Sequence, residues 1–341
     1  MYKKPVKKWI RFLHRLSKKY FNKYKLDNLF EEIELGAGRT ILLWGSKNTW
    51  MRNHIAKLKF VRRAVKKFMP GESPTNAINA TKELLKNNIP TTFTHLGENI
   101  NDLNEAETAA NHYTELIDRI YKENLDIEVS LKLTQIGFDL SFEKTLEYFK
   151  QIIKRAKDYG NNVFIDIEDS SYVDKTLEFY KKVKEEYDNV GLCLQAYLYR
   201  TMDDLKNMIE INPWIRLVKG AYKEPENIAF KKKKSVDENF FKLSKYLLSQ
   251  IQERGIRVAF GTHDLKLQQQ IKYAASEIGL IKDKLEFQML YGIKTAEQYK
   301  LAQEGFNIRT LISYGEFWYP WYMRRLAERP ANVWFVLKNI F

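Results

Sequence analysis

Apolar and polar residues follow two alternating patterns along the chain after Pro90. Short runs rich in β-branched residues have the pattern of buried strands, and longer segments with apolar residues every three or four positions have that of amphipathic helices. The predicted strands cover residues 91–96, 127–133, 163–167, 190–196, 214–218, 258–260, 285–290 and 307–312. The predicted helices cover residues 104–122, 142–159, 173–187, 202–211, 238–254, 267–278 and 295–304, and an eighth begins near Glu316.

This alternation of strands and helices favours an α/β fold, because right-handed crossovers return the chain parallel to the preceding strand. Eight such units match a closed (β/α)8 TIM barrel. The alternative is an open doubly wound sheet, which usually has a glycine-rich first turn that this sequence lacks. We therefore expect a barrel domain at residues 89–341, with its eighth helix over the barrel mouth, after an N-terminal basic helical arm at residues 1–88.

The arm begins with a strongly basic segment. Residues 1–25 contain 10 lysines and arginines and no acidic residue, and Trp9, Leu13, Leu16 and Tyr20 recur at helical spacing. Such a helix can lie on an anionic bilayer with its apolar side down. The alternative is a helix that packs on the body of the protein with its lysines in water.

Composition restricts the classes of protein to which the chain can belong. The net charge of +14 favours anionic partners, although 29% charged residues is also typical of a solvated globular surface. We expect no nucleic-acid partner. The single Cys193 excludes an internal disulfide and suits a reducing compartment. No apolar run is long enough to span a membrane, and no secretion signal is recognisable. The sequence therefore predicts a cytoplasmic protein, with peripheral membrane contact as an option.

Unusual polar residues follow the predicted strands at their carboxyl ends. In a TIM barrel these ends meet at one mouth, where the active site lies. We therefore expect one site formed by Thr94, His95, Glu98, Lys132, Gln135, Asp166, Glu168, Gln195, Tyr197, Arg216, Lys219, Tyr222, Thr262, His263 and Leu290.

Several of these residues also have purely structural interpretations. Lys132 and Asp166 come from neighbouring strands and could pair with each other. His263 could cap the next helix or be a neutral core histidine, and Glu168 could be a solvated loop residue. Arg216 lies within an apolar strand and needs an anion or an electron-rich partner, because a buried unpaired charge is costly. An excess of cations over free carboxylates predicts a bound anion, a carboxylate together with phosphates.

The predicted eighth helix carries Arg324 and Arg325 among aromatic residues. Two guanidinium groups held in this way form a fork suited to an anionic group. The alternative is that Arg324 pairs with Glu328 and Arg325 is exposed. The sequence has no HExxH, CxxC, GxSxG or phosphate-loop motif, so we expect no metal. The residues themselves thus predict a barrel enzyme for a small acid and a phosphate-bearing cofactor.

Seven segments at these strand ends resemble the proline dehydrogenase family and occur in the family's order. They are VSLKLTQIGFD, FIDIED, LQAYLYRT, RLVKGAY, GTHD, FQMLYGI and YGEFWYPWYMRRLAERP, at residues 129–139, 164–169, 194–201, 216–222, 261–264, 287–293 and 314–330. The resemblance implies a distorted barrel that binds FAD noncovalently and oxidises L-proline to Δ1-pyrroline-5-carboxylate. It also implies that electrons pass to a membrane quinone.

The resemblance also assigns roles to individual residues. Lys132, Arg324 and Arg325 match the clamp on the proline carboxylate, and Asp166 and Arg216 match the catalytic acidic residue and the arginine facing the flavin. Tyr222 and Leu290 match residues that line the proline ring, and Glu98 resembles a lid partner for one arginine. The implied FAD contacts are Ile167, Gln195, Arg216, Lys219, Gly220, Ala221, Thr262, His263 and Glu328.

The chain departs from the family at Leu311, where many members have a tyrosine that packs on the proline ring. The alternative substrates are therefore hydroxyproline or another cyclic imino acid. The chain is too short for the fused aldehyde dehydrogenase of bifunctional relatives, so we expect a separate pyrroline-5-carboxylate dehydrogenase. A hypothesis of another class is a non-catalytic basic binding protein that uses residues 1–67.

Overall fold

The computed structural model describes residues 65–97, 100–222 and 224–327, with only the backbone described for residues 324–327. Residues 63–317 form one compact unit, and residues 318–341 belong with residues 1–62 to a second unit. The predictions for residues 1–25, for Glu98 and Glu328, and for the side chains of Arg324 and Arg325 lie outside the described residues. The boundary expected at residue 88 stays a prediction.

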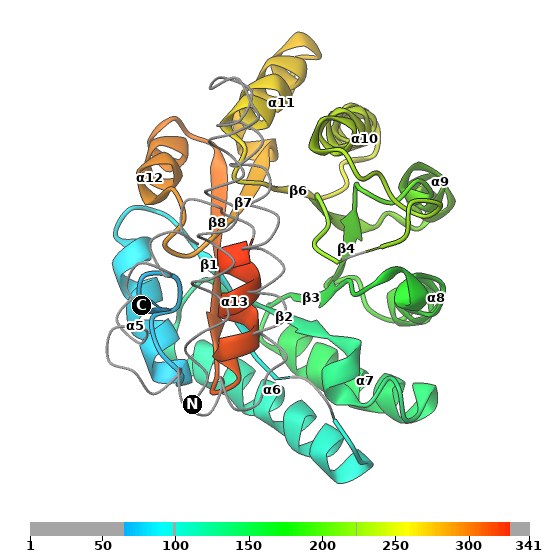
Figure 1. Ribbon diagram of the computed structural model, residues 1–341. Coiled ribbons are helices and arrows are strands. Elements are labelled where there is room, and N and C mark those ends of the chain that lie inside the picture. The colour runs from blue at the N-terminus through cyan, green and yellow to red at the C-terminus, as the bar shows by residue number, and fades with distance from the viewer. Residues whose placement is uncertain (1–64, 98–99, 223, 328–341) are drawn as a thin grey trace, which may run out of the picture. The chain divides into compact units, whose positions relative to one another are not determined.

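Eight parallel strands close into a barrel in the order in which they occur in the sequence, with β1 paired to β8 (Figure 1). The predicted TIM-barrel fold is thus confirmed. The strands are β1 (Thr91–His95), β2 (Ile127–Lys132), β3 (Val163–Asp166), β4 (Val190–Gln195), β5 (Trp214–Val218), β6 (Val258–Gly261), β7 (Glu286–Leu290) and β8 (Asn307–Tyr314).

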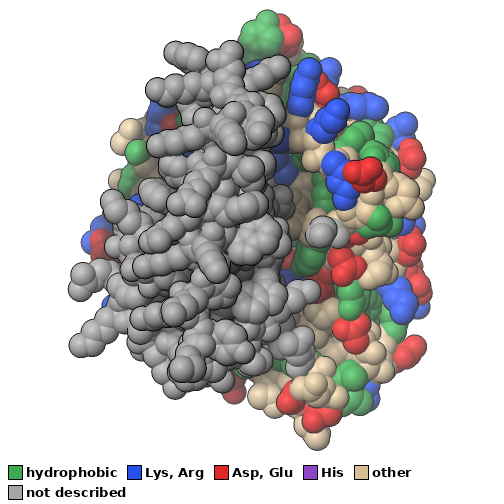
Figure 2. Space-filling model, viewed as in Figure 1, with side chains coloured by type: hydrophobic (Ala, Val, Ile, Leu, Met, Phe, Trp, Pro, Cys, Tyr) green, Lys and Arg blue, Asp and Glu red, His purple; other side chains and the backbone are tan. Residues whose placement is uncertain are grey.

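Helices connect successive strands around the outside of the barrel (Figure 1). They are α6 (Leu103–Glu123), α7 (Phe142–Asp158), α8 (Val173–Lys184), α9 (Thr201–Met208), α10 (Lys233–Arg254), α11 (Leu265–Glu277) and α12 (Thr295–Gln303), with 3₁₀ turns η1 (Leu133–Ile136), η2 (Ser170–Tyr172), η3 (Ile209–Ile211) and η4 (Lys282–Lys284). In the second unit, α13 spans Trp318–Ala327. On the face shown in Figure 2, side chains of both charge signs are interspersed over the described part, as expected for a solvated surface.

The period-two pattern of each strand separates the helix-facing core from the barrel interior. In β2, Val129 and Leu131 are buried in the main hydrophobic cluster together with helix residues. The alternate residues Glu128 and Ser130 contact Arg257, just before β6, and Arg216 of β5, on other sides of the barrel, so they point inward. The interior therefore receives polar groups from a strand that is apolar on its outer side.

Helix α5 (Pro74–Leu85), which precedes β1, was not predicted as a separate element. Ser73 caps its N-terminus in a reciprocal pair with Asn76, and the helix begins at a proline, as helices commonly do. Its Ala77 and Ile78 belong to the same hydrophobic cluster as the strands. Several other boundaries also differ from prediction, because β8 continues to Tyr314 and α10 begins five residues early, at Lys233.

The ring of Phe164 in β3 lies between two charged layers inside the barrel. The Arg216 guanidinium carbon is 4.4 Å from the ring centroid, and that of Arg257 is 5.4 Å from it. A side chain larger than hydrogen at Gly191 would collide with this ring. Glycine in β4 thus makes room for an aromatic side chain that crosses the barrel interior.

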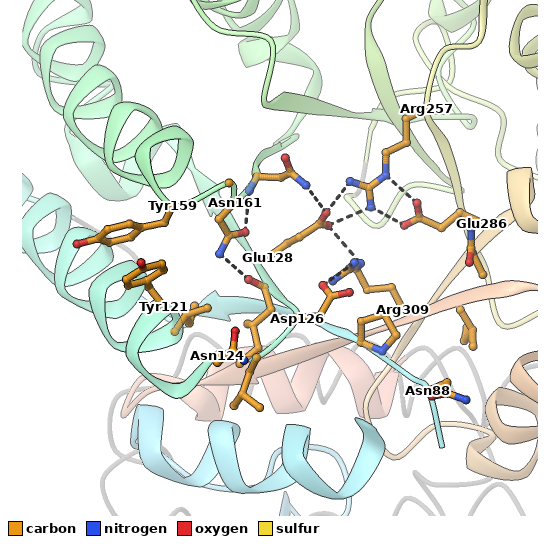
Figure 3. A pocket seen from close by; sticks show the side chains of 18 of the residues that line it. Asn88, Tyr121, Asn124, Asp126, Glu128, Tyr159, Asn161, Arg257, Glu286 and Arg309 are labelled. Atoms are coloured by element: carbon orange, nitrogen blue, oxygen red, sulfur yellow. Dashed lines mark hydrogen bonds and ion pairs between the residues drawn. The ribbon is translucent and has the colours of Figure 1, made fainter. Parts of the chain in front are cut away.

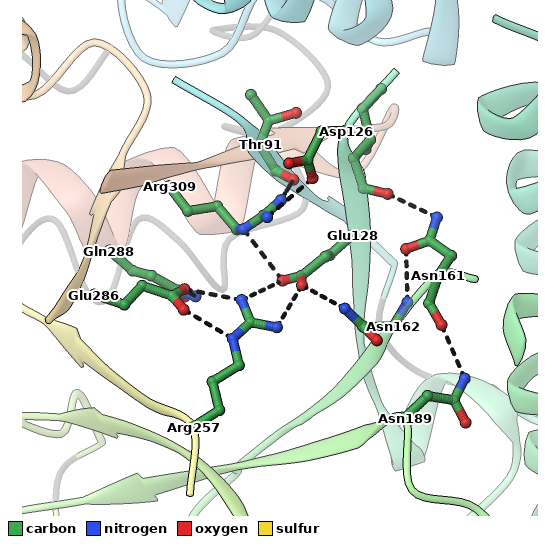
Figure 4. A network of polar contacts seen from close by, with 11 residues as sticks. Thr91, Asp126, Glu128, Asn161, Asn162, Asn189, Arg257, Glu286, Gln288 and Arg309 are labelled. Carbon is green, nitrogen blue, oxygen red and sulfur yellow. Dashed lines mark hydrogen bonds and ion pairs between the residues drawn. The ribbon is translucent and has the colours of Figure 1, made fainter. Parts of the chain in front are cut away.

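The layer at the amino ends of the strands is a network of ion pairs around Glu128 (Figure 4). Its carboxylate accepts hydrogen bonds from Arg257 at 2.5 Å and from Asn162 at 2.8 Å, and lies 3.3 Å from Arg309 Nε. Arg257 also pairs with Glu286 at 2.8 Å. Burial alone would raise the pKa of Glu128, but the two arginines outweigh it and lower this pKa. The network borders an open cavity of about 810 Å³ (Figure 3).

Candidate active site

Toward the opposite ends of the strands, Arg216 of β5 is held by two partners from across the barrel, one on β3 and one on β2. Its Nη1 donates to Asp166 Oδ1 at 2.8 Å and to Ser130 Oγ at 2.9 Å. The hydroxyl of Ser130 in turn donates to the same Asp166 oxygen at 2.8 Å. Arg216 is only 3% exposed. Its charge is balanced inside the barrel by the carboxylate of Asp166 and is further stabilised by a cation–π contact with the ring of Phe164. The predicted need of Arg216 for an anion or an electron-rich partner is therefore confirmed.

Lys132 and Asp166 are register neighbours at the ends of β2 and β3. Asp166 forms an ion pair with Arg216, and a pair between Lys132 and Asp166 stays a prediction. Glu168 is not the solvated loop residue considered from the sequence, because its carboxylate accepts a hydrogen bond from Thr134 at 2.7 Å. Burial raises the pKa of Glu168, against the opposing effects of the Thr134 hydroxyl and of Lys132. Lys132 thus has an anionic neighbour next to the Arg216–Asp166 pair.

Lys219, just beyond β5, belongs to a group of alternating charges at the helix starts. Its ammonium pairs with Asp264 at 3.0 Å and with Asp237, and Lys233 contacts the same two carboxylates. Partial burial would raise the pKa of Asp264, but Lys219 and Lys233 lower it to about 2. Asp237 and Asp264 therefore balance the charge of Lys219, and the excess of cations over free carboxylates across the whole site stays a prediction.

The turn that contains Gly220 follows Lys219 and packs against Tyr197. Gly220 has φ +109°, and a β-carbon there would collide with the Tyr197 ring, so both the backbone and the space require glycine. Beyond this turn, the buried Glu224 accepts hydrogen bonds from Ser170 N–H at 2.7 Å and Ser170 Oγ at 2.6 Å. Glu224 thereby joins the loop after β5 to the loop after β3. Neither Glu224 nor Ser130 was among the predicted site residues.

The other predicted contact residues line the same ends of the strands. Gln195 Nε2 donates to the Glu168 carbonyl at 2.6 Å, and Thr262 Oγ1 accepts from Asp264 N–H at 3.1 Å. Asp264 caps α11, so His263 is not the cap; its Nε2 instead accepts from Leu290 N–H at 3.4 Å.

The remaining predicted contact residues lie just after β3, at the end of β7 and in the loop after β5. The Ile167 side chain is buried in a small apolar cluster, so its contact with a cofactor would come from the main chain. Leu290 is paired with Leu311 in the β7–β8 register. Ala221 and Tyr222 follow Gly220 in the loop after β5.

Aromatic and histidine rings pack where β1 and β8 end. The rings of His95 and His112 have centroids 4.4 Å apart, and His112 Nε2 lies 2.8 Å from the Tyr314 hydroxyl. Burial, followed by the neighbouring His112, lowers the pKa of His95 to about 4. Burial also lowers the pKa of His112, against an opposing effect of Glu115. Both histidines are therefore neutral near pH 7.

Because His95 is neutral in the folded protein, we expect the free energy of unfolding to fall in acid. An unfolded histidine binds a proton near pH 6.5, whereas folded His95 does so only near pH 4. The free energy of unfolding is thus unaffected above pH 6.5 and falls between about pH 6.5 and 4, by about 1–2 kcal/mol at pH 5. Urea unfolding at pH 7.5 and 5.0 measures this fall. His95→Phe should make the fall smaller, and an equal fall in this variant would contradict the assignment.

Helix α13 contains four aromatic residues, three of which are buried. Trp318, Tyr319 and Tyr322 are buried, and the Trp318 ring centroid is 6.0 Å from that of Tyr319. Gly315, which directly follows β8 and has φ +123°, lies against the Leu96 carbonyl. The helix itself is confirmed and begins two residues later than predicted. The roles of its two arginines stay predictions.

Comparisons with known proteins agree with the resemblance noted in the sequence. The sequence model described as "Proline dehydrogenase" matches residues 77–338. "Proline dehydrogenase 2" of Bacillus subtilis (strain 168) is 38% identical over 303 residues, covering 89% of this chain and 98% of the relative. "Proline dehydrogenase" of Deinococcus radiodurans is 35% identical over 279 residues, covering 80% of this chain and 89% of the relative.

Solved structures show the same likeness. Proline utilization A (PutA) from Bdellovibrio bacteriovorus has a TM-score of 0.76 and 26% identity, covering 86% of this chain. PutA from Corynebacterium freiburgense has a TM-score of 0.67 at 20% identity, which shows similarity of fold, and covers 92% of this chain. This chain spans 36% and 35% of those two PutA chains, respectively.

Proposed function

This chain belongs to the proline dehydrogenase family, and from that premise we propose that it oxidises L-proline to Δ1-pyrroline-5-carboxylate in proline catabolism, with FAD as its cofactor. The observation that best supports this proposal is the buried arginine–aspartate–serine group at the mouth of the barrel. In a TIM barrel, charged residues at the carboxyl ends of the strands are the expected position of catalytic groups. The alternative of a non-catalytic basic binding protein has no comparable support.

The residues at the mouth fit a flavin. Nε and Nη2 of Arg216 are buried and have no hydrogen-bond partner among the described residues. A fixed cation with spare donors suits the electron-rich edge of an isoalloxazine ring. When bound, FAD supplies the redox chemistry by accepting a hydride. Following the family, we propose that it is held by Ile167, Gln195, Arg216, Lys219, Gly220, Ala221, Thr262, His263 and Glu328.

We assign charge stabilisation and substrate binding to side chains of the site. Asp166 and Ser130 fix Arg216, whose positive charge stabilises negative charge that develops during the reaction. We assign Lys132, with Arg324 and Arg325, to the substrate carboxylate, because a fixed carboxylate orients the ring and contributes to rate through positioning. Tyr222 and Leu290 are assigned to the ring of the substrate.

The wider context is also a proposal. We infer that the electrons pass to a quinone, that residues 1–25 contact the cytoplasmic face of the membrane peripherally, and that a separate pyrroline-5-carboxylate dehydrogenase uses the product. No helix in the described part of the chain is long and apolar enough to cross a membrane.

The decisive experiment is a visible spectrum of the purified protein incubated with FAD, before and after anaerobic addition of L-proline. We expect a flavin spectrum that bleaches on addition of L-proline. A protein that stays colourless after incubation with FAD, or a bound flavin that L-proline does not reduce, would rule the proposal out.

The leucine at position 311 favours hydroxyproline as a second candidate substrate. Leu311 has the inward register of β8, beside Leu290, where it offers neither a ring nor a hydroxyl. We therefore propose trans-4-hydroxy-L-proline as the alternative substrate, tested by comparing kcat/KM for the two imino acids. A strong preference for L-proline removes this alternative.

A further inference from the structure

The buried side chain of Gln135 joins three parts of the barrel mouth. It lies in η1, the turn directly after β2. Its Nε2 donates to the carbonyls of His95 at 2.7 Å and Gly97 at 2.9 Å. Its Oε1 accepts from the Lys132 N–H and from the Tyr113 hydroxyl, both at 3.1 Å. The amide has two donors and two acceptor sites, so its hydrogen-bonding capacity is fully used.

These four bonds connect elements that are distant in sequence. His95 ends β1, and Gly97 lies in the loop that leads from β1 to α6, whereas Tyr113 is a buried residue of α6 itself. The fourth bond goes to the main chain of Lys132 at the end of β2. Gln135 therefore fixes the loop after β1 and the main chain of Lys132 with a single rigid amide.

We propose that Gln135 is a positioning residue for recognition of the substrate carboxylate. By fixing the main chain of Lys132 and the adjacent loop, it sets the direction in which the Lys132 ammonium faces the substrate. This inference rests on the proposed function, because it takes Lys132 as a ligand of that carboxylate. Gln135 does not touch the reacting atoms and acts through Lys132.

The chemistry of the site requires glutamine. A glutamate has no N–H to donate to the two carbonyls, and its negative charge would be repelled by both carbonyl oxygens. An asparagine is one methylene shorter and cannot keep all four contacts. Gln135→Glu is therefore a near-isosteric change that removes both anchoring bonds to the loop after β1 and repels the side chain from the two carbonyls, so the oxygen that accepts from the Lys132 N–H is no longer held in place.

The test compares Gln135→Glu with Tyr113→Phe in the full chain with bound flavin. Gln135→Glu should raise KM for L-proline at least tenfold while kcat stays within threefold, since a loss of ground-state positioning appears in KM. The flavin content and visible spectrum should be unchanged. Tyr113→Phe removes one partner of Oε1 and leaves both loop bonds and the Lys132 bond, so its KM should stay within twofold.

A double-mutant cycle separates positioning from a structural role. If Gln135 acts through Lys132, adding Gln135→Glu to Lys132→Met should cause little further rise in KM. If Gln135→Glu does not fold, Gln135→Met replaces it, and the same KM rise is required. An unchanged KM, a fall in kcat alone, or a full additional effect in the Lys132→Met background would overturn the inference. Failure of the proposed function would appear separately, as wild-type flavin that L-proline does not reduce.

Discussion

Asp166→Ala is expected to lower kcat/KM for proline oxidation at least a hundredfold. The change removes the counter-ion of Arg216, a cation that is 3% exposed and bonded to Asp166 at 2.8 Å. Without this partner the guanidinium loses its fixed orientation, and with it the stabilisation of charge that develops in the transition state. A hundredfold loss corresponds to about 2.7 kcal/mol, within the range found when one such electrostatic group is removed.

The same substitution should lower the free energy of unfolding by about 3–5 kcal/mol, because it leaves a buried charge uncompensated. Urea unfolding and steady-state kinetics measure the two effects. Adding Arg216→Met removes the stranded charge, so the double variant should be more stable than Asp166→Ala but equally inactive. A kcat/KM within tenfold of wild type for Asp166→Ala would show that this pair does not serve the reaction.

At the amino ends of the strands, Glu128→Ala is the substitution that should lower the free energy of unfolding most. The carboxylate of Glu128 is almost fully buried and is shared by Arg257 and Arg309. Its loss leaves two guanidinium groups with Glu286 and Asp126 as their remaining carboxylates. We expect a loss of about 3 kcal/mol in the free energy of unfolding, at the lower end for a broken buried pair because these partners remain.

The matched control is Asp126→Asn, which removes a carboxylate from the same network at its exposed edge. The side chain of Asp126 is 60% exposed and pairs with Arg309 at 2.9 Å. An ion pair of this kind contributes less than about 1 kcal/mol, so the control should unfold almost as wild type does. Both variants should keep kcat/KM within twofold below their unfolding temperatures. Equal losses in the free energy of unfolding for the two variants would show that the effect of Glu128→Ala does not depend on the burial of Glu128.

Most of the barrel could be predicted from the sequence because its strands and helices differ in hydrophobic period. The eight strand runs and the order of the helices depend on this local signal, and both are confirmed. Helix α5 has apolar residues at helical spacing, Ala77, Ile78 and Leu84, but the prediction assigned all of residues 1–88 to one basic arm and did not separate this helix from it. The early start of α10 at Lys233 was missed because four lysines at residues 231–234 gave no apolar periodicity.

The candidate site could be predicted as a set of strand-end residues but not as a set of contacts. The need of Arg216 for a partner follows from its apolar strand, yet nothing in the sequence identifies Asp166 as that partner. The partners of Lys219 lie 18 and 45 residues away, at helix starts rather than strand ends. Such pairings depend on tertiary packing, which periodicity does not encode. The roles of Arg324 and Arg325 still rest on the family resemblance.

The Phe164 ring between Arg216 and Arg257 has a consequence for how this enzyme can be modified. Because the Phe164 ring separates the two charged layers, we expect that substitutions around Glu128 can raise thermal stability without changing the chemistry around Asp166. Stability could then be changed at one end of the barrel and catalysis at the other. Gly191 is the position that makes this independence sterically feasible, since any larger residue there would displace the ring.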